Sequence, residues 1–181
     1  MSENTTRSSV DESSDNEYKL VVAGSRSFTE DMSDERAYKL CCSAIARLPV
    51  RPTEIVSGGA RGADTVGEKV AREHNIDLAV FEPDWDEHGR AAGPIRNQQM
   101  AEYADGVLAI WDCESRGTQS MIECAMDEIG ATWTWVLDYP NSPRENGEIR
   151  WIQTKPAIEG EPGGSFPERF LANHMHHSPP Q

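Results

Sequence analysis

Short apolar runs alternate along the chain with stretches that carry apolar residues at helical spacing. Because a strand, a helix and a further strand form a parallel crossover, this alternation predicts an α/β fold. We expect an open parallel sheet of about five strands with helices on both faces, and a loop over residues 86–92. The expected strands are residues 18–23, 55–57, 77–81, 106–111 and 132–137.

The chain is long enough for one good core. Its 181 residues are 37% hydrophobic, which would leave two full domains thinly packed. Residues 1–17 are almost entirely polar, and residues 139–181 hold seven of the eleven prolines. We therefore expect a disordered acidic tail over 1–17, one domain over 18–138, and a proline-rich extension over 139–181 with one short edge strand at residues 148–154 as an option.

The charge and composition of the chain limit the classes of partner that it is expected to bind. The chain has 31 acidic and 17 basic residues, a net charge of −14, which disfavours nucleic acid or an anionic membrane as partner and resembles a salt-adapted, halophilic surface. No Cys-x-x-Cys pair, signal sequence or long apolar run is present, so a cytoplasmic location is expected. His174, His176 and His177 have no cysteine or carboxylate frame around them, so we expect no metal site and no cofactor.

Candidate ligand contacts follow the first four strands. The first loop begins with Gly24, Ser25 and Arg26, and the others are residues 57–64, 82–85 and 112–118. Ligands of open α/β sheets bind beyond the carboxyl ends of the strands, so all four loops are expected to line one crevice.

The loop over residues 57–64 reads Ser-Gly-Gly-Ala-Arg-Gly-Ala-Asp. Its glycines let the backbone approach a ligand closely, and unpaired amides at the following helix start, together with Arg61, offer positive charge. The pattern favours a phosphate or oxyanion cradle, although it is neither a Walker loop nor a dinucleotide fingerprint. An ordinary strand-to-helix turn is the alternative, and Asp64 is as well suited to capping or orienting that turn as to acid–base chemistry.

Four arginines are expected around the crevice. Arg26, Arg61 and Arg116 lie in three of the loops, and Arg96 lies on the helix between the third and fourth strands. In an acidic chain they would focus a local positive potential on an anionic ligand, unless each of them pairs with a neighbouring acid.

Several of these motifs together resemble the YspA/cpYpsA-related branch of the SLOG superfamily, which also includes DprA/Smf and the LOG phosphoribohydrolases. They are residues 24–26, 57–64, Trp85 with 88–100, 104–105, and 115–118 with Ile122 and Ala125. The resemblance covers roughly residues 19–137 and implies a Rossmann-like fold that binds a nucleotide or a nucleotide-derived ligand. The implied ligand-binding residues are Gly24, Ser25, Arg26, Ser57, Gly58, Gly59, Arg61, Gly62, Asp64, Trp85, Arg96, Asn97, Ser115, Arg116, Gly117 and Thr118.

The resemblance leaves catalysis open. LOG hydrolases cleave an N-glycosidic bond of a nucleoside monophosphate with an arginine of an Arg-x-x-x-Met stretch and a glutamate three residues after the threonine of a glycine-rich turn. Arg96 matches the first motif, but the glutamate position is Met121, which cannot act as an acid or base. Glu123 should point away from the crevice, since it lies two positions further along the same helix. Catalysis, if any, would involve Arg96 and Asp64, with Glu82 as another candidate carboxylate; Asp84 and His88 are further acid–base candidates.

Three functions follow in order of preference. The first is binding or sensing of a nucleotide or nucleotide-derived ligand, the second a LOG-like hydrolase, and the third a DprA-like binder of single-stranded DNA, which the charge disfavours. Within such a crevice Glu82 could accept a ribose hydroxyl and Trp85 could stack on a base. The expected partner is a small molecule, no membrane is expected, and a homo-oligomer is left open.

Overall fold

The computed structural model describes residues 17–30, 32–130, 132–136 and 150–153 of the chain. Apart from Glu17 and residues 150–153, the two tails expected from composition lie outside these residues, and so do the three tail histidines.

One sheet runs through the described part of the chain, with the strand order β3-β2-β1-β4-β5-β6. The four strands β3-β2-β1-β4 form its parallel centre; β5 also pairs in parallel with β4, whereas β6 pairs antiparallel with β5. The expected parallel strands lie where they were predicted, with ends shifted by at most one residue. The strands are β1 (Lys19–Gly24), β2 (Glu54–Ser57), β3 (Asp77–Val80), β4 (Gly106–Trp111), β5 (Trp133–Val136) and β6 (Arg150–Gln153).

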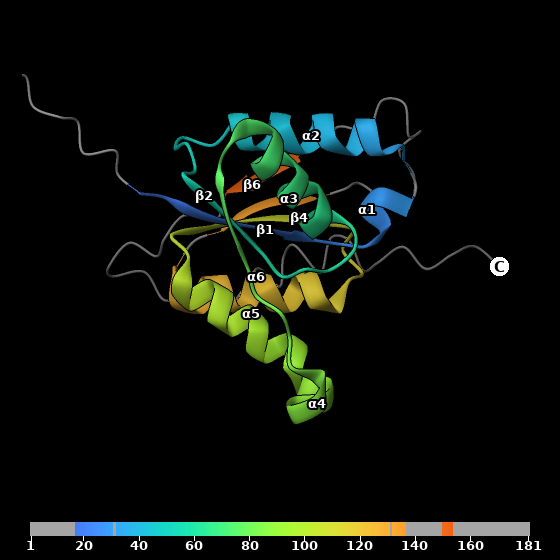
Figure 1. Cartoon of the computed structure of the whole chain (residues 1–181), viewed down its shortest axis with the longest axis vertical. Helices are drawn as coiled ribbons and strands as arrows, with labels where there is room; N and C mark the ends of the chain where they lie inside the picture. The colour runs from blue at the N-terminus through green and yellow to red at the C-terminus, as the bar shows by residue number, and fades with distance from the viewer. Residues whose placement is uncertain (1–16, 31, 131, 137–149, 154–181) are drawn as a thin grey trace, which may run out of the picture.

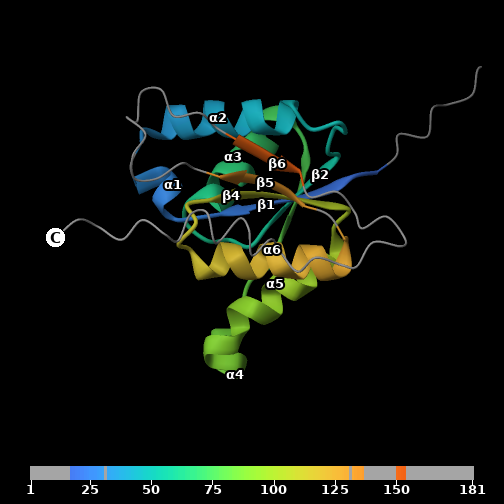
Figure 2. The same cartoon turned by 180° about the vertical axis from the view of Figure 1, so that it is seen from behind.

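Helices cover both faces of the sheet, as Figures 1 and 2 show. The helices α2 (Asp34–Ala46) and α3 (Ala63–His74) lie on one face, and α5 (Ala92–Tyr103) and α6 (Arg116–Glu128) lie on the other. A short helix α1 (Ser27–Glu30) follows β1. The predicted Rossmann-like arrangement is confirmed.

The central strand β1 divides the core into two layers. Leu20 and Val22 pack toward α2 and α3, whereas Val21 and Ala23 pack toward α5 and α6. Because successive side chains of a strand alternate between faces and both faces are covered, the four inner residues of β1, 20–23, have to be apolar. The same constraint makes every residue of β4 buried.

The segment predicted as a loop over residues 86–92 is instead mostly helical. It contains α4 (Trp85–His88) and the short 3₁₀ helix η1 (Gly89–Ala91), and α5 begins at Ala92. The Asp84 carboxylate caps α4 by accepting a hydrogen bond from the Glu87 amide at 2.9 Å. This turn projects away from the sheet (Figures 1 and 2) and buries no side chain, so it has no apolar period by which the sequence could have revealed it.

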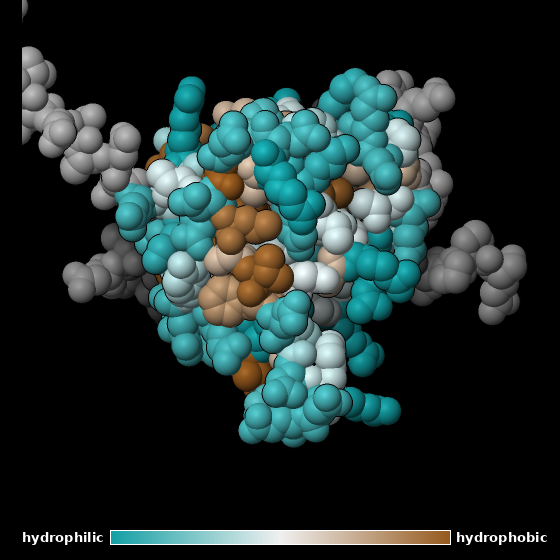
Figure 3. Space-filling view, viewed as in Figure 1, coloured by the Kyte–Doolittle hydropathy of each residue, from teal (hydrophilic) through white to brown (hydrophobic). Residues whose placement is uncertain are grey.

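The surface along the edge strand β3 is the most apolar part of the face shown in Figure 3. Brown side chains gather there along β3 and the segment that follows it. Val80 at the end of β3 is 44% exposed, and Tyr103 at the end of α5 is 39% exposed. Elsewhere on this face hydrophilic side chains predominate.

Two helical glycines provide a matched test of packing between α3 and β1. A Cβ on Gly67 would lie 2.8 Å from the Val22 side chain, whereas one on Gly117 would meet nothing within 4 Å. Gly67→Ala should destabilise the protein by about 1–3 kcal/mol, because overpacking outweighs the roughly 1 kcal/mol by which alanine favours a helix. Gly117→Ala should leave the free energy of unfolding unchanged or raise it slightly. Urea unfolding of both variants checks this, and equal effects would contradict the close approach.

Candidate functional site

A cleft of about 710 Å³ opens at the carboxyl ends of the strands, and a smaller pocket of about 330 Å³ lies beside it. All four predicted loops contribute to these cavities, as the parallel topology requires. Ser25, Ser57 and Gly62 line neither cavity. The predicted residues that line one or both are Gly24, Arg26, Gly58, Gly59, Arg61, Asp64, Glu82, Trp85, Arg96, Asn97, Ser115, Arg116, Gly117 and Thr118.

The glycine-rich turn is held by its own side chains. Asp64 is 3% exposed, and its Oδ2 accepts hydrogen bonds from the amides of Gly58 at 3.2 Å and Ala60 at 3.4 Å. The Gly59 amide donates to Ser57 Oγ at 3.1 Å. These amides are therefore used inside the turn, because Asp64 in the first turn of α3 reaches back to them.

Arg96 fixes the same turn from the opposite face of the sheet. Its Nη1 donates to the Gly58 carbonyl oxygen, and its Nε donates to Asn97 Oδ1 at 3.1 Å. A Cβ on Gly58 would overlap the Arg96 guanidinium and lie 3.0 Å from Asp64 Oδ2. Glycine at position 58 is thus required by the close approach of a carboxylate and an arginine from within the protein.

The start of α3 lies against the loop after β1, and Gly62, Ala63 and Asp64 are buried there. The N-cap of α3 is Gly62, which has a φ of +98° and supplies no side-chain cap. A Cβ there would lie 2.6 Å from the Ser25 carbonyl oxygen, so only glycine fits between the two loops. The first amides of a helix have no intrahelical acceptor, and the positive end of the helix dipole favours an anion beside them.

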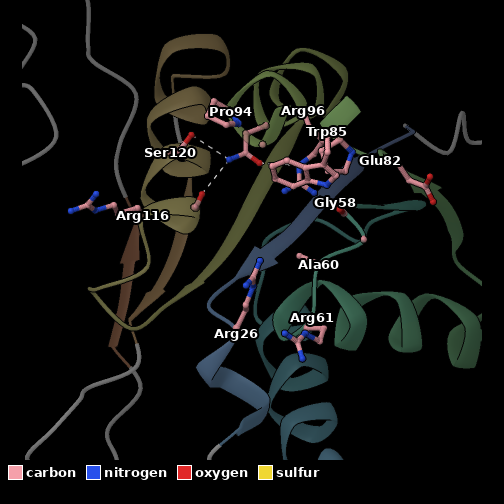
Figure 4. A pocket seen from close by; sticks show the side chains of 15 residues that line it. Arg26, Gly58, Ala60, Arg61, Glu82, Trp85, Pro94, Arg96, Arg116 and Ser120 are labelled. Atoms are coloured by element: carbon pink, nitrogen blue, oxygen red, sulfur yellow. Dashed lines mark hydrogen bonds between the residues drawn. The ribbon is translucent and has the colours of Figure 1, made fainter. Parts of the chain in front are cut away.

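Exposed arginines surround this helix start. Arg26, from the loop after β1, and Arg61 both lie below Ala60 in Figure 4. Arg116 also lines the cleft, but its side chain extends away from the other two. Within the described residues none of these three arginines forms an ion pair with a carboxylate. Among the described residues, the alternative in which each arginine pairs with a neighbouring acid is therefore not observed for these three.

A second carboxylate, which the sequence patterns did not single out, organises the loop after β4. Asp112 Oδ1 accepts from the amides of Glu114 at 3.0 Å and Ser115 at 2.8 Å, and Oδ2 accepts from Ser27 Oγ at 2.6 Å. The Asp112 amide donates to Ser25 Oγ at 3.1 Å. Ser25 thus links the loop after β1 to the loop after β4 by a hydrogen bond. An aspartate directly after a fully apolar strand was the signal available for it.

Helix α6 starts differently from α3. Ser115 caps it by accepting from the Thr118 amide at 3.4 Å, so one of its first amides is already bonded within the protein. Asn97, 4% exposed, donates to the Gly117 carbonyl oxygen at 3.2 Å and to Ser120 Oγ at 3.3 Å, the bonds dashed in Figure 4. The turn over residues 115–118, which is predicted to contact the ligand, is thus also joined to α5 by these bonds.

The two carboxylates of the smaller pocket titrate differently. Burial raises the pKa of Asp64 to about 6, against the opposing effects of Arg96 and of the amides of Ala60, Gly24 and Gly58. Burial also acts to raise the pKa of Asp112, but its hydrogen bonds outweigh burial and hold that pKa below the ordinary value. Burial lowers the pKa of Arg96, and Asp64 opposes this effect.

The position at which the resemblance to LOG hydrolases would place a glutamate carries no carboxylate. Met121 is a residue of α6. It is 1% exposed, packs in the core and lines the smaller pocket. Glu123 is exposed and accepts from Gln119 Nε2 at 2.9 Å, so it points away from the cleft as predicted. Glu82 is exposed at the rim of the larger cleft, whereas Asp84 and His88 line neither cavity.

Two absences apply to the described part of the chain. Residues 17–30, 32–130, 132–136 and 150–153 include no group of three or more histidine, cysteine, aspartate or glutamate side chains placed to hold a metal ion. No helix among them is long and apolar enough to cross a membrane.

The raised pKa of Asp64 predicts a specific pH dependence. The folded state binds this proton more tightly than the unfolded state, so the stabilising contribution is complete below an ordinary pKa of 3.8 and is lost as pH rises through about 6. Asp64→Asn cannot lose a proton. From about pH 4 to about pH 7, the free energy of unfolding of the wild type should fall by about 2 kcal/mol relative to this variant. Urea unfolding at intermediate pH values measures the difference, and parallel pH profiles would contradict it.

Comparison with known proteins agrees with this geometry. Residues 18–88 match the model of the YspA, cpYpsA-related SLOG family. The "Gene 61 protein" of Mycobacterium phage D29 is 37% identical to this chain over an alignment of 71 residues. The match covers 36% of this chain and 57% of that protein. No solved structure matches. The part of the chain that resembles this family is thus residues 18–88, less than half of its length, which include β1, the glycine-rich turn and the start of α3.

Proposed function

We propose that the cleft binds a nucleotide or a nucleotide-derived ligand and that the protein is a binding or sensing module without LOG-type cleavage. The observation that carries this proposal is the uncapped start of α3 beside Arg26 and Arg61, two arginines with no acidic partner among the described residues. In a chain of net charge −14, these two arginines form a local region of positive charge, which favours binding of a phosphate.

The size and construction of the cleft support a small ligand. A volume of about 710 Å³ lies within the range of small-molecule sites. The turn over residues 57–64 is held by Asp64 and Arg96, so its shape exists before any ligand binds. A preorganised site binds without the entropic cost of ordering loops.

The proposal of binding without cleavage rests on Met121. A buried thioether occupies the position at which LOG hydrolases carry their glutamate, so no carboxylate acts there on a glycosidic bond. A general acid or base contributes typically about 10²- to 10⁴-fold to a rate. Without one at this position, a bound nucleotide would be retained intact.

The anion site can be tested with AMP as the probe. Arg61→Ala should weaken AMP binding by about tenfold, since a hydrogen bond to a charged group contributes about 1.5–3 kcal/mol. Arg51→Ala is the matched control, because Arg51 is also exposed but precedes β2 at the amino edge of the sheet. Isothermal titration calorimetry on both variants and the wild type measures the effect. Absence of AMP binding, or equal affinities in the two variants, would refute the anion site.

The absence of cleavage is a separate prediction. Wild-type protein incubated with AMP should release no adenine above the uncatalysed rate, as measured by chromatography of the products. Met121→Glu should introduce release if it folds, because it restores a carboxylate near Arg96, and Met121→Gln serves as the uncharged control. Adenine release by the wild type that is abolished in Arg96→Ala would show that another carboxylate acts, and the proposal of a binding module would be wrong.

A further inference from the structure

We infer that Trp85 is the base-binding platform of the cleft, so that the ligand is a nucleoside phosphate whose ring stacks on the indole. This inference rests on the proposed function and adds to it which chemical groups of the ligand are recognised and where. A sugar phosphate would satisfy the anion site alone, whereas a nucleotide would occupy both ends of the cleft.

The exposure of Trp85 is the first observation. Its side chain is 58% exposed, more than Val80 at 44%, Tyr103 at 39% or Ile95 at 36%, the other exposed large apolar side chains of the described residues. An indole exposed to water lacks the favourable free energy that burial of its apolar surface would give. The Trp85 side chain lies on the wall of the cleft. It therefore offers an aromatic surface where a ligand would bind.

The backbone around Trp85 is held in place, which a platform requires. The Trp85 amide donates to the Pro83 carbonyl oxygen at 3.1 Å, and its own carbonyl oxygen accepts from the Gly89 amide. The Asp84 cap on the Glu87 amide closes the same helical turn. The otherwise exposed helix α4 thus has a defined geometry at its first residue.

The indole also has one supported side. A Cβ added to Gly93 would lie 3.6 Å from Trp85 Cη2, an ordinary van der Waals distance, so the ring packs beside the backbone at the start of α5. Gly93 and Pro94 line the cleft together with Trp85. The ring is therefore supported by α5 and retains open surface toward the cleft.

The two ends of the cleft differ in chemistry. Figure 4 shows Trp85 above Gly58, whereas Arg26 and Arg61 lie below Ala60 on the other side of the glycine-rich turn. A ligand with a flat aromatic ring at one end and a phosphate at the other matches this arrangement. Arg96 lies beside Trp85 in Figure 4, but its guanidinium is bonded to the Gly58 carbonyl oxygen, so it is less available to a ligand than the exposed Arg26 and Arg61. A mononucleotide therefore fits better than a strand of nucleic acid, which needs positive charge along its whole path.

The test compares AMP with ribose 5-phosphate, which lacks the ring, by calorimetry on the full chain. Trp85→Ala should weaken AMP binding by about tenfold and leave ribose 5-phosphate binding unchanged, because stacking involves the base alone. Trp85→Phe should retain most of the AMP affinity. Tyr103→Ala is the matched control, since Tyr103 is an exposed aromatic residue that does not line the cleft.

Several results would overturn the platform. These are AMP binding that is unchanged in Trp85→Ala, an equal loss for AMP and ribose 5-phosphate, or a thymidine octamer that binds more tightly than AMP in a Trp85-dependent manner. If ribose 5-phosphate binds in an Arg61-dependent manner while Trp85→Ala leaves AMP binding unchanged, the platform fails but the anion site of the proposed function stands. If the wild type binds neither small molecule, both fail.

Discussion

A buried carboxylate shapes the site. Asp64 accepts hydrogen bonds from Gly58 and Ala60 in a place where water reaches it hardly at all. Burying a charge is unfavourable unless it is paired and hydrogen-bonded, and the raised pKa of Asp64 shows that burial is only partly offset here. The closed form of the turn depends on this group, because it bonds two amides of the turn.

The second carboxylate performs a related task at the neighbouring loop. Asp112 uses both oxygens to hold Ser27 and the backbone of Glu114 and Ser115. The floor of the site is therefore a network of groups satisfied within the protein, which rigidifies it. The side chains of Arg26, Arg61 and Arg116 are exposed at the cleft above this floor. The polar groups of the floor are bonded within the protein, whereas the arginines at the rim are exposed to solvent. Such a site keeps its shape without a ligand and still has charged groups to offer to one.

The extent to which sequence patterns reveal such a structure depends on burial. The strands β1 and β4 are covered on both faces, so their continuous apolar runs predicted them within one residue. Helix α4 buries nothing and left no periodic signal. Its capping residue Asp84 was present in the sequence, but a single cap without an apolar face is too weak a pattern to identify a helix.

For the site, the sequence by itself determined which loops meet, because strand order and parallel pairing place them at one edge of the sheet. It also determined that Met121 stands at the position of the LOG glutamate. Only the tertiary structure decided which polar groups are free. The amides of Gly58 and Ala60 are occupied because the Asp64 side chain folds back on them, and Arg96 reaches the same turn from a helix 38 residues away in sequence. Arg26 and Arg61 lack acidic partners because none of the described carboxylates lies close to them in space, a property of three-dimensional proximity that a linear pattern does not encode.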